Sequence, residues 1–117
     1  MSANDTPAIW SDWRPFPDPQ SRGVLIAPFG PGCYDIRRQD TNEKVLFGAA
    51  GHVAQRMTSL LPRPLGAGTR DNASKREYVA RHIGHIEYRT AACSSVEEAK
   101  KLERELRKNR NSYLFPT

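Results

Sequence analysis

Three side chains in this sequence could act together on a phosphate group: Tyr34, Arg56 and Glu103. An arginine guanidinium can hydrogen-bond two phosphate oxygens at once, and a carboxylate can hold a divalent cation whose other positions are filled by water. Hydrolysis of a phosphodiester needs an activated water, a cation near the phosphate and stabilisation of the transition-state charge. Each residue alone also has an ordinary interpretation, as a half-buried strand tyrosine, a surface helix arginine and one acid in a charged helix.

The chain around Tyr34 has the pattern of a β-hairpin that leads into a helix. Two short apolar runs flank a polar turn at residues 39–43, which is typical of a hairpin with a loop longer than two residues. From Val53 the apolar residues take helical spacing, and Pro62 ends this helix. We expect Gly48 to let the backbone turn tightly from the second strand towards the helix.

A second helix, a third strand and a last helix are predicted downstream. Asn72 is expected to cap a helix that Gly84 closes, and alternation over residues 85–92 predicts a strand. Ser95 opens the last helix with Glu98 three residues later, as in a capping box. The order β-β-α-α-β-α predicts an α/β (α+β) domain, in which a small three-stranded antiparallel sheet is flanked by three helices.

The motif residues of this hairpin and helix resemble those of the GIY-YIG endonuclease superfamily. The first triplet is Gly32-Cys33-Tyr34, the second is Leu46-Phe47-Gly48, and an arginine follows eight residues later at Arg56. The resemblance covers residues 30–117 and includes Glu103 on the last helix. It implies the family's three-stranded antiparallel sheet and a metal-dependent endonuclease that hydrolyses phosphodiester bonds in DNA.

The same resemblance implies a role for each of the three residues. Tyr34 would help to activate or position the attacking water, and Arg56 would clamp the phosphate. Glu103 would hold a single Mg²⁺, or Mn²⁺, with waters completing its shell. Glu105 is a neighbouring carboxylate, but it points about 200° away around the helix.

Leu46 departs from the family, because it stands where the second tyrosine belongs and can donate neither a hydrogen bond nor a proton. His52 and Tyr88 are the candidates for the missing group, and the helix start beside His52 favours its neutral, base-competent form. Leu46 also keeps a second hypothesis open, that of a catalytically impaired module that binds nucleic acid or a protein partner. The least specific alternative is a basic structural domain.

The charge balance favours a polyanionic partner. With 18 basic and 13 acidic residues the chain carries a net charge of +5, and nucleic acid is the simplest such partner. The resemblance specifies DNA. The basic residues expected to contact it are Arg37, Arg38, Arg63, Arg70, Lys75 and Arg76.

The 117 residues allow one domain with a small core, preceded by an extension. The extension is residues 1–22, rich in proline and carrying Trp10 and Trp13, which could stack on bases, and the domain is residues 23–117. No apolar run approaches the roughly 20 residues of a membrane helix, so no membrane partner is expected. The two distant cysteines and the lack of a signal-peptide pattern predict reduced thiols in a cytoplasmic protein.

Overall fold

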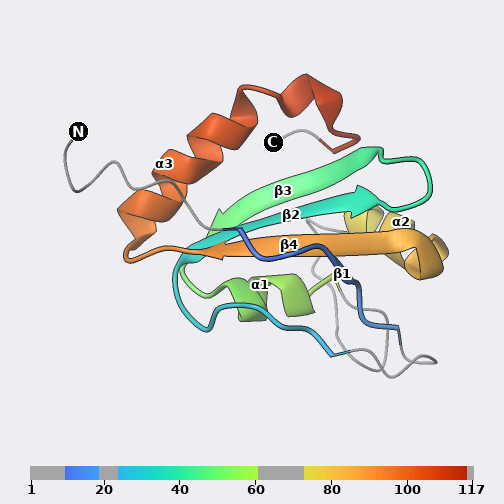
Figure 1. The fold of residues 1–117 in the computed structure, drawn as a ribbon, viewed down its shortest axis with the longest axis horizontal. Helices are drawn as coiled ribbons and strands as arrows, with labels where there is room; N and C mark the ends of the chain where they lie inside the picture. The colour runs from blue at the N-terminus through green and yellow to red at the C-terminus, as the bar shows by residue number, and fades with distance from the viewer. Residues whose placement is uncertain (1–9, 19–23, 61–72, 116–117) are drawn as a thin grey trace.

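The structure is a computed structural model that describes residues 10–18, 24–60 and 73–115. At its centre lies a four-stranded sheet in the order β1-β4-β2-β3 (Figure 1), in which every pair of neighbours is antiparallel. The strands are β1 (Arg14–Pro15), β2 (Gly32–Arg38), β3 (Lys44–Ala50) and β4 (Ile86–Ala92). The predicted α+β class is therefore confirmed.

The strand that the sequence did not predict is β1, and it comes from the segment assigned to the N-terminal extension. Arg14 pairs with Tyr88, and the Phe16 side chain, only 2% exposed, joins the core. A two-residue strand that ends in a proline carries no periodic signal, which is why the sequence pattern predicted three strands. For residues 23–30 the short apolar run in the sequence suggests either an edge strand or an extended lead-in. The described part of this segment, residues 24–30, forms no strand.

The β2–β3 hairpin has the predicted turn. The Arg38 amide donates to the Glu43 carbonyl at 2.7 Å, which closes the loop. Asn42 adopts a φ of 60°, in the left-handed region that asparagine tolerates better than most residues. The hairpin register places Tyr34 opposite Gly48, and this pairing builds the candidate site.

In the described part of the chain three helices accompany the sheet: α1 (Val53–Thr58), α2 (Ala73–Arg81) and α3 (Val96–Arg107), with short 3₁₀ turns at Ile83–His85 and Arg110–Ser112. Two helix ends differ from the predictions, because α1 ends at Thr58 and Gly84 lies inside a 3₁₀ turn. The predicted cap of α3 is present, since the Ser95 hydroxyl accepts from the Glu98 amide at 3.1 Å. The proposed cap at Asn72 lies outside the described residues.

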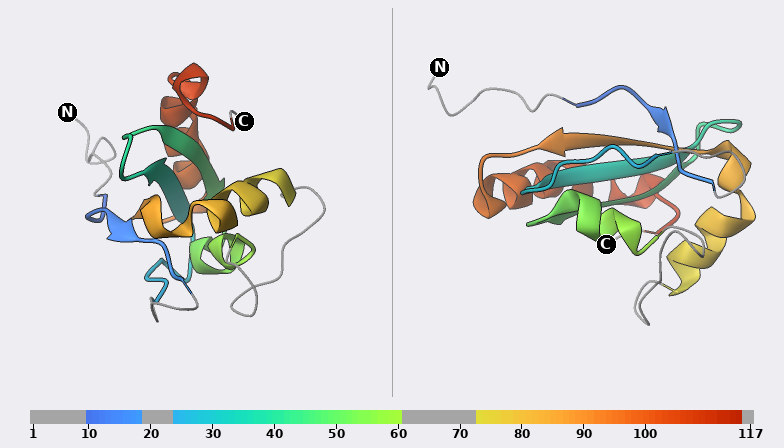
Figure 2. Two further views of the ribbon diagram at one scale, coloured as in Figure 1. Left: turned by 90° about the vertical axis from the view of Figure 1, so that its right-hand side faces the viewer. Right: turned by 90° about the horizontal axis from the view of Figure 1, so that it is seen from below.

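The two faces of the sheet are covered by different helices. Tyr34 and Ile36 point into the main core with Val53 and Met57 of α1. The Cys33 thiol, on the other face, donates to the Ala99 carbonyl of α3 at 3.2 Å. Figures 1 and 2 show α1 and α3 on opposite sides of the sheet. Residues that alternate along β2 therefore serve two separate layers.

Gly32, the first motif glycine, gives a stability prediction. A Cβ there would lie 2.3 Å from the Ala91 carbonyl oxygen, a backbone atom of β4 that cannot move without disturbing the sheet. A Cβ on Gly30, in contrast, would meet no atom within 4 Å. We expect Gly32→Ala to lower the free energy of unfolding by about 2–3 kcal/mol, measured by urea denaturation. Gly30→Ala is the matched control and should change the free energy of unfolding by less than about 0.5 kcal/mol. Equal effects of the two substitutions would show that the close approach of Gly32 to the Ala91 carbonyl does not require a glycine.

Candidate active site

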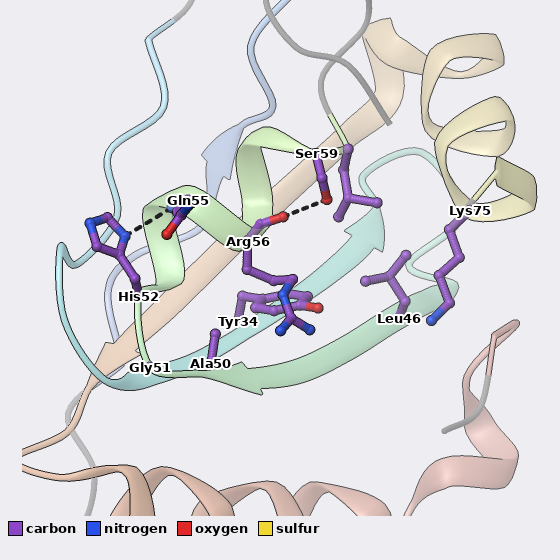
Figure 3. A pocket seen from close by; sticks show the side chains of 10 residues that line it. Tyr34, Leu46, Ala50, Gly51, His52, Gln55, Arg56, Ser59 and Lys75 are labelled. Carbon is purple, nitrogen blue, oxygen red and sulfur yellow. Dashed lines mark hydrogen bonds between the residues drawn. The ribbon is translucent and has the colours of Figure 1, made fainter. Parts of the chain in front are cut away.

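A pocket of about 880 Å³ opens between the hairpin and α1, on the face of the sheet that carries the main core. Figure 3 shows Tyr34 and Leu46 on the strand side, Arg56 and His52 on the α1 side, and Lys75 of α2 on the far wall. The described residues that line it are Tyr34, Leu46, Ala50, Gly51, His52, Gln55, Arg56, Ser59, Leu60 and Lys75. The pocket therefore combines two cationic side chains with a phenol.

Gly48, the second motif glycine, makes room for the Tyr34 ring. A Cβ at Gly48 would lie 2.5 Å from the Tyr34 hydroxyl oxygen, so the hydroxyl lies directly over the glycine backbone. The expectation that Gly48 turns the chain towards the helix was wrong, because β3 continues to Ala50 and the turn comes at Gly51 and His52. Gly48 is needed because it leaves space for the Tyr34 side chain of the neighbouring strand.

Tyr34 is a neutral phenol in this environment. Burial raises the pKa of Tyr34, the nearby Arg56 guanidinium partly opposes this rise in pKa, and the Glu103 carboxylate adds to it. The net effect is a pKa above the ordinary value for tyrosine, so the hydroxyl keeps its proton at neutral pH. In this state Tyr34 can donate a hydrogen bond to a phosphate oxygen or to a water, and it cannot act as a phenolate base.

Arg56 is an exposed residue whose guanidinium lies beside Tyr34 (Figure 3). The start of α1 is fixed by two backbone hydrogen bonds, from the Val53 amide to the Gly30 carbonyl at 3.1 Å and from the Ala54 amide to the Pro28 carbonyl at 2.9 Å. Because Arg56 follows one turn later, its backbone position is set by the segment that leads into β2. The structure thus brings together the tyrosine and the arginine of the two motifs.

Glu103 lies next to this pocket without lining it. Its Oε2 accepts from the Ala49 amide of β3 at 3.2 Å, and its Oε1 accepts from Arg107 at 3.1 Å. Ala49 directly follows Gly48, so the Glu103 carboxylate and the Tyr34 hydroxyl contact adjacent residues of the same edge strand. The carboxylate approaches that strand from α3, and the phenol approaches it from the pocket side.

The Glu103 carboxylate suits a metal held mostly by water and substrate. Each of its oxygens accepts one hydrogen bond and keeps a further lone pair. Among the described residues no group of three or more His, Cys, Asp and Glu side chains is placed to hold a metal ion. Mg²⁺ is commonly bound by one or two carboxylates together with waters and phosphate oxygens, so the donor set fits that ion. Glu105 pairs with Lys108 at 3.1 Å instead.

The two substitutes considered for the missing tyrosine are placed differently. Tyr88 is fully buried, and its hydroxyl accepts from the Ile26 amide at 2.8 Å, away from the pocket lining. His52 does line the pocket, but its Nδ1 accepts from the Gln55 amide at 3.0 Å as the N-cap of α1. A neutral imidazole with Nδ1 occupied carries its proton on Nε2, which makes His52 a hydrogen-bond donor rather than a free base.

Leu46, in the place of the second tyrosine, is 1% exposed and belongs to the main core while it lines the pocket. It pairs with Ile36 across the hairpin, two residues before Gly48, and points to the same face as Tyr34. The position at which the GIY-YIG resemblance expects a second tyrosine is therefore filled by an aliphatic side chain, which lies next to Lys75 in Figure 3.

Of the basic residues expected to contact DNA that the structure describes, Lys75 is the one that lines the pocket. Arg37 pairs with Glu87 and stacks on Trp13, with its guanidinium carbon 3.9 Å from the ring centroid. Arg38 binds Asp40, and this interaction lowers the pKa of that carboxyl to about 2. Arg76 lies on α2 and does not line the pocket. The remaining two, Arg63 and Arg70, are outside the described residues.

The opposite face of the sheet holds a polar network that the sequence did not point to. Asp35 is 2% exposed, and it accepts from Tyr113 at 2.8 Å and from Arg89 at 3.0 Å. Arg89 in turn stacks on Trp10 and Trp13. The two tryptophans thus contact arginines of the domain, and their stacking on bases stays a prediction. The feature of the sequence that could have revealed this network is Asp35, a carboxylate between Tyr34 and Ile36 in a predicted strand.

No protein-family model and no curated protein matches this chain. The GIY-YIG resemblance accordingly depends on the motif residues themselves. Within the described residues, the helices are all too short or too polar to cross a membrane.

Proposed function

We propose that this chain is a Mg²⁺-dependent endonuclease domain of the GIY-YIG type, which hydrolyses phosphodiester bonds in DNA. The observation that supports it best is the pairing of the Arg56 guanidinium with a neutral Tyr34 phenol in a pocket whose far wall carries Lys75. Two cations and a hydrogen-bond donor directed at one open space suit a phosphate group.

In this proposal each residue has a defined task. Arg56 binds two oxygens of the scissile phosphate through its guanidinium, and Lys75 adds positive charge from α2. Tyr34 keeps its proton and orients the attacking water or a phosphate oxygen by a hydrogen bond. Glu103 would hold Mg²⁺, which when bound would polarise the phosphate and make a water more acidic.

A second candidate is a module of the same fold that binds nucleic acid or a protein partner without turnover. Leu46 favours it, because an aliphatic side chain stands where the resemblance expects the second tyrosine, and the Nδ1 of His52 is occupied by the cap of α1. The two candidates share the phosphate-binding residues and differ in turnover.

Binding to duplex DNA tests what the two nucleic-acid candidates share. Lys75→Ala should weaken binding and reduce the slope of log K against log salt by about one unit, because one phosphate contact is lost. The measurement is fluorescence polarisation of a labelled duplex between about 50 and 200 mM NaCl. Lys100→Ala removes the same charge from the exposed surface of α3, away from the pocket lining, and is the matched control.

The salt titration has two results that count against the assignment. If the wild type does not bind DNA at low salt, both nucleic-acid candidates are lost. If Lys75→Ala and Lys100→Ala weaken binding equally, the pocket is not the phosphate site and the charge acts only through the net value of +5.

A further inference from the structure

Phe29 is an exposed aromatic residue held firmly at the edge of the pocket. Its side chain is 83% exposed, the largest exposed fraction among the large hydrophobic residues described. The neighbouring carbonyls of Pro28 and Gly30 accept from the Ala54 and Val53 amides, so the backbone on both sides of Phe29 is fastened to α1. Because the ring is mostly exposed, its burial within this chain contributes little to the stability of the fold.

The Phe29 ring extends the pocket outwards. It stacks on the His52 imidazole with ring centroids 5.7 Å apart and an interplanar angle of 24°. His52 lines the same pocket as Tyr34 and Arg56. Arg56 lies four residues after His52, about 6 Å along the helix axis. A flat group on the outer face of Phe29 would therefore be separated from a phosphate bound at Arg56 by the two stacked rings and one helical turn.

We propose that Phe29, backed by His52, is a stacking platform for an unpaired nucleobase next to the scissile phosphate. The proposal rests on the proposed function and specifies its substrate class, which is nucleic acid with a single-stranded nucleotide at the cleavage position, such as a flap or a loop. Bases stack on aromatic side chains whatever their identity, because every base has a π face. A base inside an intact duplex is already stacked on both of its faces and cannot cover this ring.

The exposed residues that precede Phe29 provide a contrast. Val24 and Ile26 are 73% and 53% exposed, on the same extended segment. The Ile26 amide donates to the buried Tyr88 hydroxyl, so this part of the segment is also fixed. Neither side chain can stack on a base. A protein partner would use all three side chains for their apolar area, whereas a nucleobase would use Phe29 alone.

The experiment compares full-length Phe29→Leu, Phe29→Trp and Ile26→Ala on two fluorescein-labelled DNAs, a single-stranded oligonucleotide and a blunt duplex. Phe29→Leu keeps the apolar character and removes the ring, so it should weaken single-strand binding about ten-fold and leave duplex binding within about two-fold. Phe29→Trp should bind the single strand at least as well as the wild type. Ile26→Ala should leave both affinities unchanged.

Three results would overturn the proposal. If Phe29→Leu binds both DNAs like the wild type, the ring has no part in binding. If it weakens duplex and single-strand binding equally, no unpaired base is recognised. If Phe29→Leu and Ile26→Ala leave DNA binding intact and dissociate a complex seen by size-exclusion chromatography, the segment is a protein-contact surface. The DNA affinity of Arg56→Ala is measured in the same experiment. If it is lost while Phe29→Leu binds like the wild type, the stacking platform is wrong but the phosphate site of the proposed function still holds.

Discussion

Arg56→Ala is expected to lower the rate of single-turnover DNA cleavage in Mg²⁺ by about 10²–10³-fold, the effect of removing one preorganised donor to a developing negative charge. The guanidinium lies beside the Tyr34 phenol and is the cation best placed to bind two phosphate oxygens in this pocket. Because the side chain is exposed, the free energy of unfolding should change by less than about 0.5 kcal/mol. The loss should therefore appear in cleavage and not in folding.

Three further variants separate the geometry of the guanidinium from its charge and from the metal. Arg56→Lys keeps the charge without the planar fork and should cleave at an intermediate rate. Glu103→Gln keeps the shape of the side chain and removes its charge, and raising the Mg²⁺ concentration should not restore cleavage. Arg81→Ala removes an exposed arginine of α2 that pairs with Glu77, and it should cleave like the wild type. If Arg56→Ala cleaves at the wild-type rate, the pocket is not the site at which the scissile phosphate binds.

Local signals in the sequence predicted the framework of this site well. The polar turn between two apolar runs predicted the β2–β3 hairpin, and the serine and glutamate spacing predicted the start of α3. Both signals depend on residues within a few positions of one another. The order of the other strands and helices followed from the same kind of pattern, since each of these longer elements carries its own period, whereas β1 is too short to do so.

The properties that were not predicted depend on contacts across the fold. The need for glycine at position 48 comes from the Tyr34 hydroxyl of the paired strand, which no local pattern shows. The occupation of Nδ1 in His52 depends on the helix that it caps, and the burial of Tyr88 depends on the segment around Ile26. Phe29 follows the proline that ends a short apolar run in the sequence, and its exposure becomes evident only in the folded chain.

Leu46→Tyr is expected to raise the cleavage rate by about 10²–10⁴-fold, the usual contribution of a positioned acid–base or orienting group. Leu46 lines the pocket on the same face as Tyr34, so a tyrosine at this position would direct its hydroxyl towards the space between Tyr34 and Lys75. Leu46 is also a core residue, and the larger ring should cost about 1–3 kcal/mol of stability. Cleavage is therefore compared at a temperature where all variants are folded by circular dichroism.

Leu46→Phe is the control that isolates the hydroxyl, because it brings the same ring and the same strain. A gain in Leu46→Tyr that is absent from Leu46→Phe assigns the effect to the oxygen. A wild type that already cleaves fast and gains nothing from Leu46→Tyr would mean that another pocket group does this task. His52 is then the residue to replace, since Tyr88 is buried away from the pocket lining. If the wild type and Leu46→Tyr are both as inert as Glu103→Gln, the domain binds its nucleic acid without cutting it, because the missing hydroxyl is then not what prevents turnover.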